Sequence, residues 1–136
     1  MKKSVLFLSI LLTVLFSCNS NDNEPLQDQV IGNWKLFKHT KNGVEDSLSD
    51  CDKQSSFVYN TDGSYREVIV RNGVNGSCRN VETRDGTWEN AGNGFYNLKL
   101  NNSSAGSNTK YIFKGNTYYV EYTINKKLNK VYYQKN

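Results

Sequence analysis

The sequence predicts an all-β protein, a small up-and-down antiparallel β-barrel of about eight strands. Short runs rich in aromatic and β-branched residues recur along the chain, separated by clusters of Asn, Gly, Asp and Ser. Side chains alternate within the runs, most clearly where Tyr118, Val120 and Tyr122 face away from Tyr119 and Glu121. No window of about eleven residues carries a helical stripe. Because most connections are short, successive strands should be neighbours, and closure would remove exposed edges.

The expected elements follow in order along the chain. Pro25, with Leu26 and Val30 at four-residue spacing, predicts one or two helical turns that end at Gly32. The expected strands span residues 32–40, 54–60, 64–72, 78–84, 86–90, 95–101, 109–114, 117–125 and 130–134. The fourth and fifth runs are also consistent with one strand bent at Asp85-Gly86, so the total is eight or nine.

The expected turns contain residues that tolerate positive φ, as hairpins require. They are Thr61-Asp62-Gly63, Arg84-Asp85-Gly86, Gly92-Asn93-Gly94 and Lys114-Gly115-Asn116. All nine tyrosines fall in the expected strands, where aromatic rings suit a pleated, half-buried surface.

The first seventeen residues are typical of a secretory signal peptide. Lys2 and Lys3 precede an apolar run that is too short for a membrane span, and the run ends at Ser17-Cys18. Leu15, Ser17 and Cys18 resemble the lipobox of bacterial lipoproteins. The resemblance implies cleavage before Cys18, lipid on its sulfur and a stable anchor in the bacterial cell envelope, with the outer membrane expected.

A polar tether is expected over residues 18–29, followed by one barrel domain over residues 30–136. Asp22 and Glu24 are similar to the acidic surface-export signal of Bacteroidetes lipoproteins. They favour exposure at the cell surface, and the periplasmic face is the other possibility.

Cys51 and Cys78 remain once Cys18 is assigned to lipid. In an oxidising compartment a disulfide is the expected state of such a pair. Two free thiols are the alternative. Metal ligation is disfavoured because no second cysteine lies at two-residue spacing and His39 is the only histidine.

Charge and motifs argue against several function classes. The chain has 17 basic and 13 acidic side chains; removing Lys2 and Lys3 leaves 15 against 13, or +2, too little to predict nucleic-acid binding. His39 is expected to face solvent near the end of the first strand, so no catalytic residue is predicted. The acidic stretch 45–52 is expected to be a solvated loop, with no metal site and no cofactor. Asp46-Ser47-Leu48 matches a short O-glycosylation pattern of exported Bacteroidetes proteins.

Four segments resemble the lipocalin-like domain of Bacteroidetes lipoproteins. They are Gly32-Asn33-Trp34, the stretch from Phe57 to Tyr65, Gly86-Thr87-Trp88, and the aromatic series from Tyr118 to Tyr122. The resemblance covers nearly the whole mature chain. It implies that the glycine turns the chain into the barrel, that the tryptophan packs across the closed end, and that Cys51 and Cys78 form a pair.

An eight-stranded barrel is just wide enough to be filled by side chains or to hold one small ligand. The expected interior residues are Phe57, Tyr96, Leu98, Tyr118, Val120, Tyr122 and Ile124. Phe57, Tyr96, Tyr118 and Tyr122 are the candidate contacts to a small hydrophobic ligand. In the alternative interpretation the barrel is filled, and residues 41–50 and 101–108 contact a protein or glycan. The oligomeric state is not predicted.

Overall fold

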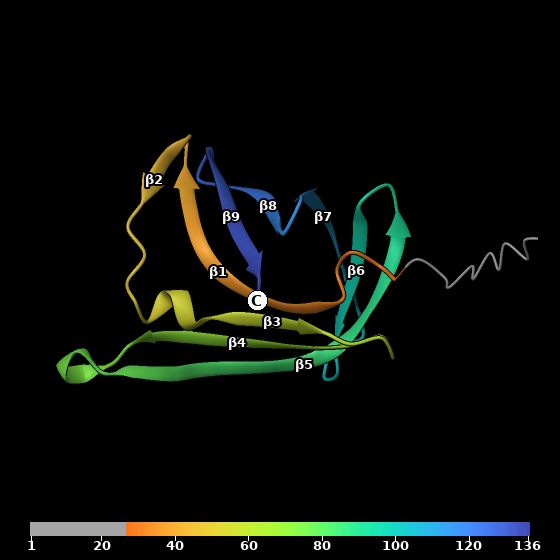
Figure 1. Ribbon diagram of the computed structural model, residues 1–136, viewed down its shortest axis with the longest axis horizontal. Coiled ribbons are helices and arrows are strands. Elements are labelled where there is room, and N and C mark those ends of the chain that lie inside the picture. The colour runs from red at the N-terminus through yellow and green to blue at the C-terminus, as the bar shows by residue number, and fades with distance from the viewer. Residues whose placement is uncertain (1–26) are drawn as a thin grey trace, which may run out of the picture.

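The computed structural model describes residues 27–136, which form a closed, eight-stranded antiparallel β-barrel with one additional short strand (Figure 1). The predicted fold class is confirmed. The strands are β1 (Gly32–Lys41), β2 (Val44–Asp46), β3 (Ser56–Tyr59), β4 (Ser64–Asn72), β5 (Cys78–Gly92), β6 (Phe95–Leu100), β7 (Ser107–Lys114), β8 (Thr117–Ile124) and β9 (Lys127–Lys135). Two short 3-10 turns, η1 (Asp52–Gln54) and η2 (Val74–Gly76), interrupt the connections.

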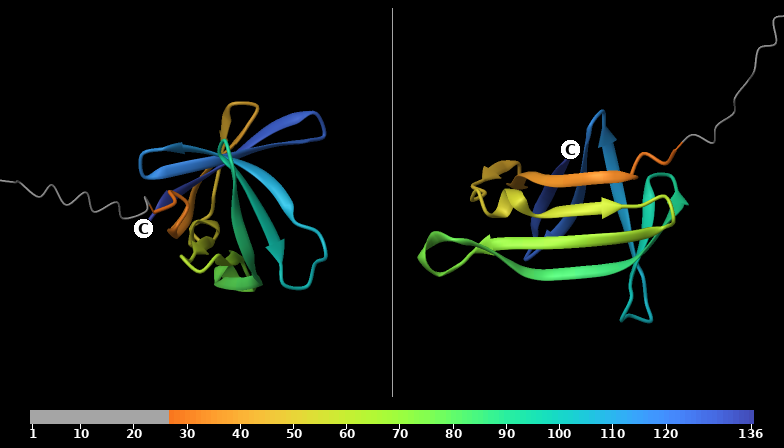
Figure 2. Two further views of the ribbon diagram at one scale, coloured as in Figure 1. Left: turned by 90° about the vertical axis from the view of Figure 1, so that its right-hand side faces the viewer. Right: turned by 60° about the horizontal axis from the view of Figure 1, so that its bottom comes forward.

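The barrel closes through β1, which pairs with β9 along almost its whole length. On the other edge of β1, β3 pairs with residues 32–35 and β2 pairs with residues 39–41. From β3 to β9 each strand pairs with the next. The β4–β5 hairpin extends beyond the neighbouring strands in both Figure 1 and the right-hand view of Figure 2.

One end of the barrel is closed by the residues that lead into β1. Gly32 has a φ of +135°, and this conformation, which other residues rarely adopt, turns the chain into the first strand. Trp34 is 1% exposed, and its indole nitrogen donates to the Val30 carbonyl at 2.6 Å. The Asp28 carboxylate accepts from the Tyr96 hydroxyl at 2.7 Å and ties this segment to β6. Trp34 is therefore part of the core, as expected.

The one or two helical turns predicted before β1 are not a helix in the described residues. Residues 28–31 make a single turn, closed by the Ile31 amide donating to the Asp28 carbonyl. The Asp28 carboxylate also accepts from the Val30 amide at 3.0 Å. This local side-chain bond to the backbone competes with helix formation. Pro25 lies outside the described residues.

The expected turn at Arg84-Asp85-Gly86 is also wrong, because β5 continues through these residues. Gly86 is buried opposite Tyr65 in the β4–β5 register. A Cβ there would lie 2.6 Å from Tyr65 Cε1 and would also clash with the Lys99 carbonyl oxygen. Glycine is required at this position for close packing rather than for positive φ. Strand β2 was not expected, because three exposed residues carry no alternation.

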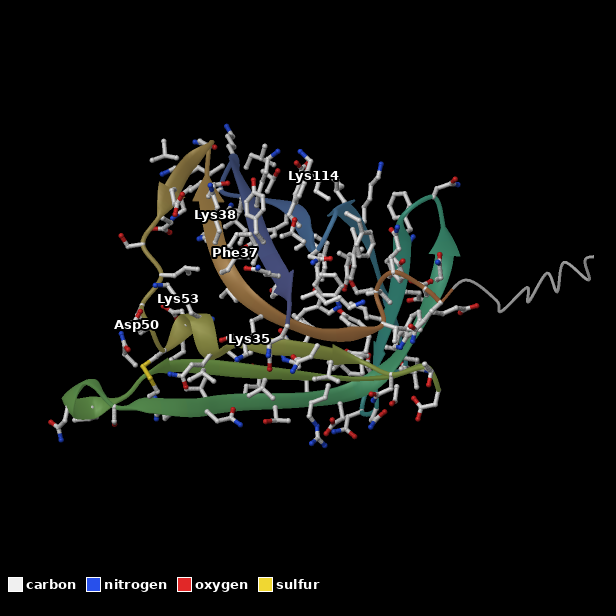
Figure 3. All side chains as sticks on the ribbon, in the orientation of Figure 1. Lys35, Phe37, Lys38, Asp50, Lys53 and Lys114 are labelled. Carbon is white, nitrogen blue, oxygen red and sulfur yellow. A yellow bond between two sulfur atoms is a disulfide. The ribbon has the colours of Figure 1, made fainter. Side chains whose placement is uncertain are left out.

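Cys51 and Cys78 form the predicted disulfide, with Cα atoms 5.1 Å apart (Figure 3). It joins the segment before η1 to the first residue of β5. Nearby, the buried Ser55 hydroxyl accepts from the Val70 amide at 2.9 Å and so fixes η1 against β4. Within residues 27–136, no helix has the length and apolar character needed to span a membrane.

Reducing the Cys51–Cys78 disulfide should lower the free energy of unfolding by about 3–4 kcal/mol, because the bond closes a loop with a sequence separation of 27. Urea unfolding with and without reductant measures the loss. The double variant Cys51→Ser, Cys78→Ser is the control and should be insensitive to reductant. Equal midpoints for the oxidised and reduced protein would contradict the prediction.

Candidate functional site

The interior of the barrel is hollowed by two adjoining lobes, both partly open to solvent. The larger lobe has a volume of about 630 Å³ and lies among β1, β3, β4, β5, β8 and β9, with residues 46–48 at its edge. The smaller lobe, of about 350 Å³, lies beside β6, β7 and residues 103–107. Both lobes are lined by Phe57, Glu67, Arg84, Val120 and Tyr133. Because they share these residues, the two lobes form one site, which we call the central cavity.

Stacked tyrosines separate the central cavity from the closed end of the barrel. The ring of Tyr118 stacks on Tyr111 with centroids 4.7 Å apart and on Tyr133 with centroids 5.0 Å apart. The Tyr111 hydroxyl lies 2.7 Å from that of Tyr59. Burial raises the pKa of Tyr118 and of Tyr59 well above its ordinary value, so both hydroxyls stay protonated. Beyond these rings the barrel is filled by side chains.

An ion pair lines the junction between the two lobes. Glu67 on β4 lies opposite Arg84 on β5, and Arg84 Nη1 donates to Glu67 Oε2 at 3.2 Å. Arg84 also donates twice to Glu82, from Nε at 2.7 Å and from Nη2 at 2.8 Å. The wall of the central cavity therefore combines aromatic surface with a carboxylate and a guanidinium.

Burial raises the pKa of Glu67. Removal of water from the carboxylate is the largest cause, and the neighbouring charge of Glu82 adds to it. The guanidiniums of Arg84 and Arg71 act in the opposite direction without cancelling the effect. Ionisation of Glu67 therefore lowers the free energy of unfolding.

Glu67 and Arg84 were not predicted as site residues, although the sequence carries a signal for them. Alternation puts Glu67 on the same strand face as Tyr65, which is buried. Once β4 and β5 are paired, Arg84 falls directly opposite Glu67. Charged side chains in a strand are usually assigned to solvent, and for this reason the pair was overlooked.

His39 does not face solvent as expected. The register between β1 and β9 shifts between Leu36 and Lys38. Because of this bulge, the residues after it face the opposite side of the sheet from the side that simple alternation predicts. His39 consequently lines the larger lobe. Its Nδ1 lies 3.3 Å from an Asp46 carboxylate oxygen, and its Nε2 lies 3.2 Å from Asn129 Oδ1.

The predicted contact residues are only partly brought together. Phe57 lines both lobes, Tyr118 lines the smaller lobe, and Tyr122 lines the larger one. Tyr96 is buried at the closed end and lines neither. Ile124, an expected interior residue, is 56% exposed. The predicted signal peptide, the predicted lipid attachment at Cys18 and the predicted tether up to residue 26 lie outside the described residues.

The two segments expected to contact partners both border the central cavity. Ser47 and Leu48 line the larger lobe, and Ser103 and Ser107 line the smaller one. No group of three or more His, Cys, Asp or Glu side chains within residues 27–136 is arranged to hold a metal ion. No protein-family model, curated protein or solved structure matches this chain.

Replacing Glu67 should alter how stability depends on pH. Because the pKa of Glu67 is higher in the folded than in the unfolded state, its ionisation destabilises the fold as pH rises from about 4.5 through the raised pKa. The Glu67→Gln variant has no carboxyl group to ionise at this position, so it does not lose this stability as pH rises. The stability of the variant relative to the wild type should therefore increase between pH 4 and pH 7, as measured by urea unfolding at each pH. Parallel stability curves for the two proteins would contradict the prediction.

Proposed function

We propose that this protein is a lipid-anchored lipoprotein of the bacterial cell envelope whose barrel binds a small, largely hydrophobic molecule without catalysis. The observation that carries the proposal is the central cavity, whose larger lobe has a volume of about 630 Å³. Ligand sites have volumes from about 300 Å³ upward and lie in concave, mostly apolar surroundings. The resemblance to lipocalin-like lipoproteins supports the same assignment.

The lining of the central cavity suits such a ligand. Phe57, Val120 and Tyr133 offer apolar and aromatic surface to both lobes, and Leu98 and Leu100 extend it in the smaller lobe. A few polar groups among apolar walls are the usual means of fixing the orientation of a ligand. Glu67 and Arg84 supply such groups at the junction between the lobes. The wall of the larger lobe also carries Asp46, Asp52 and Arg71, so the smaller lobe is the more apolar of the two.

The proposed anchor rests on the sequence alone. Leu15, Ser17 and Cys18 resemble a lipobox, and the polar residues that follow give the barrel a tether. The cleaved chain would carry its lipid on Cys18, where two or more acyl chains are sufficient for stable attachment.

Filling the central cavity should abolish ligand binding. Val120→Trp places a large ring where both lobes meet, whereas Ile112→Trp adds the same ring next to Tyr119 on the outer face. We expect the full chain in non-ionic detergent to bind the neutral alcohol 1-naphthaleneethanol. Val120→Trp should weaken binding by at least about tenfold and Ile112→Trp by less than about twofold, as measured by equilibrium dialysis.

Failure of the wild-type chain to bind this alcohol or an amine or carboxylate of similar size would contradict the binding proposal. It would favour the alternative in which residues 41–50 and 101–108 contact a protein or glycan. Equal binding by Val120→Trp and the wild type would place the ligand outside the barrel and would also contradict the proposal.

The anchor is tested separately at Cys18. When the full chain is expressed in a bacterium that lipidates lipoproteins, it should partition into the detergent phase of a Triton X-114 extract. Cys18→Ser should move it to the aqueous phase, because no acyl chain can be attached. The barrel variant Ile112→Trp is the control and should partition as the wild type does. Detergent partitioning by Cys18→Ser would contradict lipidation at this residue.

A further inference from the structure

The Glu67 carboxylate has an oxygen available to a ligand. Its Oε2 accepts from Arg84 Nη1, whereas Oε1 accepts no hydrogen bond from any residue between 27 and 136. Every fully buried side-chain nitrogen or oxygen in this part of the chain has a hydrogen-bond partner. Glu67 Oε1 is therefore not sealed in the wall, and the carboxylate faces the central cavity, which Glu67 lines from both lobes.

The guanidiniums of the cavity wall are already paired. Arg84 is shared between Glu67 and Glu82, and Arg71 donates to Asp52 at 3.2 Å. The charged side chains that line the larger lobe, apart from His39, are three carboxylates and two guanidiniums: Asp46, Asp52, Glu67, Arg71 and Arg84. A bound anion would lie beside Glu67 and would meet a guanidinium that two carboxylates already neutralise. An anionic ligand is therefore disfavoured at this place.

A bound cation would relieve the unfavourable state of Glu67. The carboxylate has lost water through burial, and Glu82 lies close by, so its pKa is raised. Phe57 lies opposite Glu67 in the β3–β4 register, and its ring packs against Tyr133 with centroids 5.4 Å apart. The faces of aromatic rings attract cations, particularly where water is excluded. The carboxylate and the rings thus favour the same kind of ligand group.

We infer that the ligand of the central cavity is an amphipathic amine, whose protonated nitrogen binds Glu67 at the junction of the two lobes while its apolar body occupies them. The inference rests on the proposed function and names the chemical class of the ligand. The ammonium group donates to Glu67 Oε1 in a charge-assisted hydrogen bond.

Three probes of similar size that differ in charge test the inference. They are 2-(1-naphthyl)ethylamine, 1-naphthaleneethanol and 1-naphthaleneacetate, measured by equilibrium dialysis against the full chain in non-ionic detergent at pH 7. Val120→Trp supplies the background from detergent and from the protein surface. We expect the wild type to bind the amine about tenfold more tightly than the alcohol and the carboxylate most weakly.

Glu67→Gln removes the charge while keeping a side chain of similar shape. This variant should bind the amine no more tightly than the alcohol, and its affinity for the alcohol should stay within about threefold of the wild type. Retained alcohol binding shows that the variant is folded. Asp85→Asn is the matched control, because it removes one negative charge from the outer face of β5, where Asp85 pairs with Arg66. This control should keep the preference for the amine.

The outcomes separate the inference from the proposed function. Binding of the alcohol without preference for the amine, or tighter binding of the carboxylate, would overturn the inference and leave a hydrophobic binding site. A preference that survives Glu67→Gln would overturn the role of this residue. If no probe binds the wild type above the Val120→Trp background, the proposed function itself fails.

Discussion

The pairing of β1 with β9 is the constraint on which the rest of the structure depends. It closes the sheet, and closure fixes the number of inward-facing positions and the space that they must fill. At one end large aromatic rings fill this space, and Trp34, Tyr59 and Tyr118 are almost fully buried there. Towards the other end the inward side chains leave the central cavity between them. Filled and hollow regions therefore result from the same closed sheet.

Placing charges inside such a barrel is costly unless they are paired. Arg84 is held by Glu67 and Glu82, and Arg71 is held by Asp52. Apolar side chains at these positions would increase the buried apolar area and would remove the cost of desolvating the carboxylate. The presence of the ion pair is understandable if the cavity must discriminate among ligands, because charged groups contribute to specificity more than to stability.

The sequence predicted the strands better than it predicted the site. Alternation and turn residues placed the eight barrel strands, including the possibility that residues 78–90 form one strand, and redox context predicted the disulfide. The site depended on features that alternation within one strand does not reveal. The bulge after Leu36 moved His39 inside, and the register between β4 and β5 brought Arg84 opposite Glu67. Both features depend on contacts between strands, which a single sequence does not specify.

Tyr96 illustrates why an inward-facing aromatic residue need not be a ligand contact. Its position on β6 points it into the barrel as expected, but its hydroxyl donates to Asp28 at the closed end. Alternation indicates which face of a strand is inside, whereas the position along the barrel axis decides whether a side chain meets cavity or core. The position of a residue along the barrel axis depends on how neighbouring strands are staggered, which alternation within one strand does not reveal.

The segment before β1 also has a consequence for how the protein would be presented on a membrane. In Figure 1 the segment that leads into β1 starts at one end of the barrel, and β2 lies at the opposite end. Leu48 and Asp52, which follow β2, border the larger lobe. If Cys18 is acylated, the nine peptide links between residues 18 and 27 reach at most about 30 Å from the bilayer. The end of the barrel that carries the tether is then held within this reach of the lipid, whereas the end that borders the larger lobe is free to lie farther away, in the aqueous phase. If the barrel binds a ligand as proposed, this arrangement would let it collect the ligand from solution.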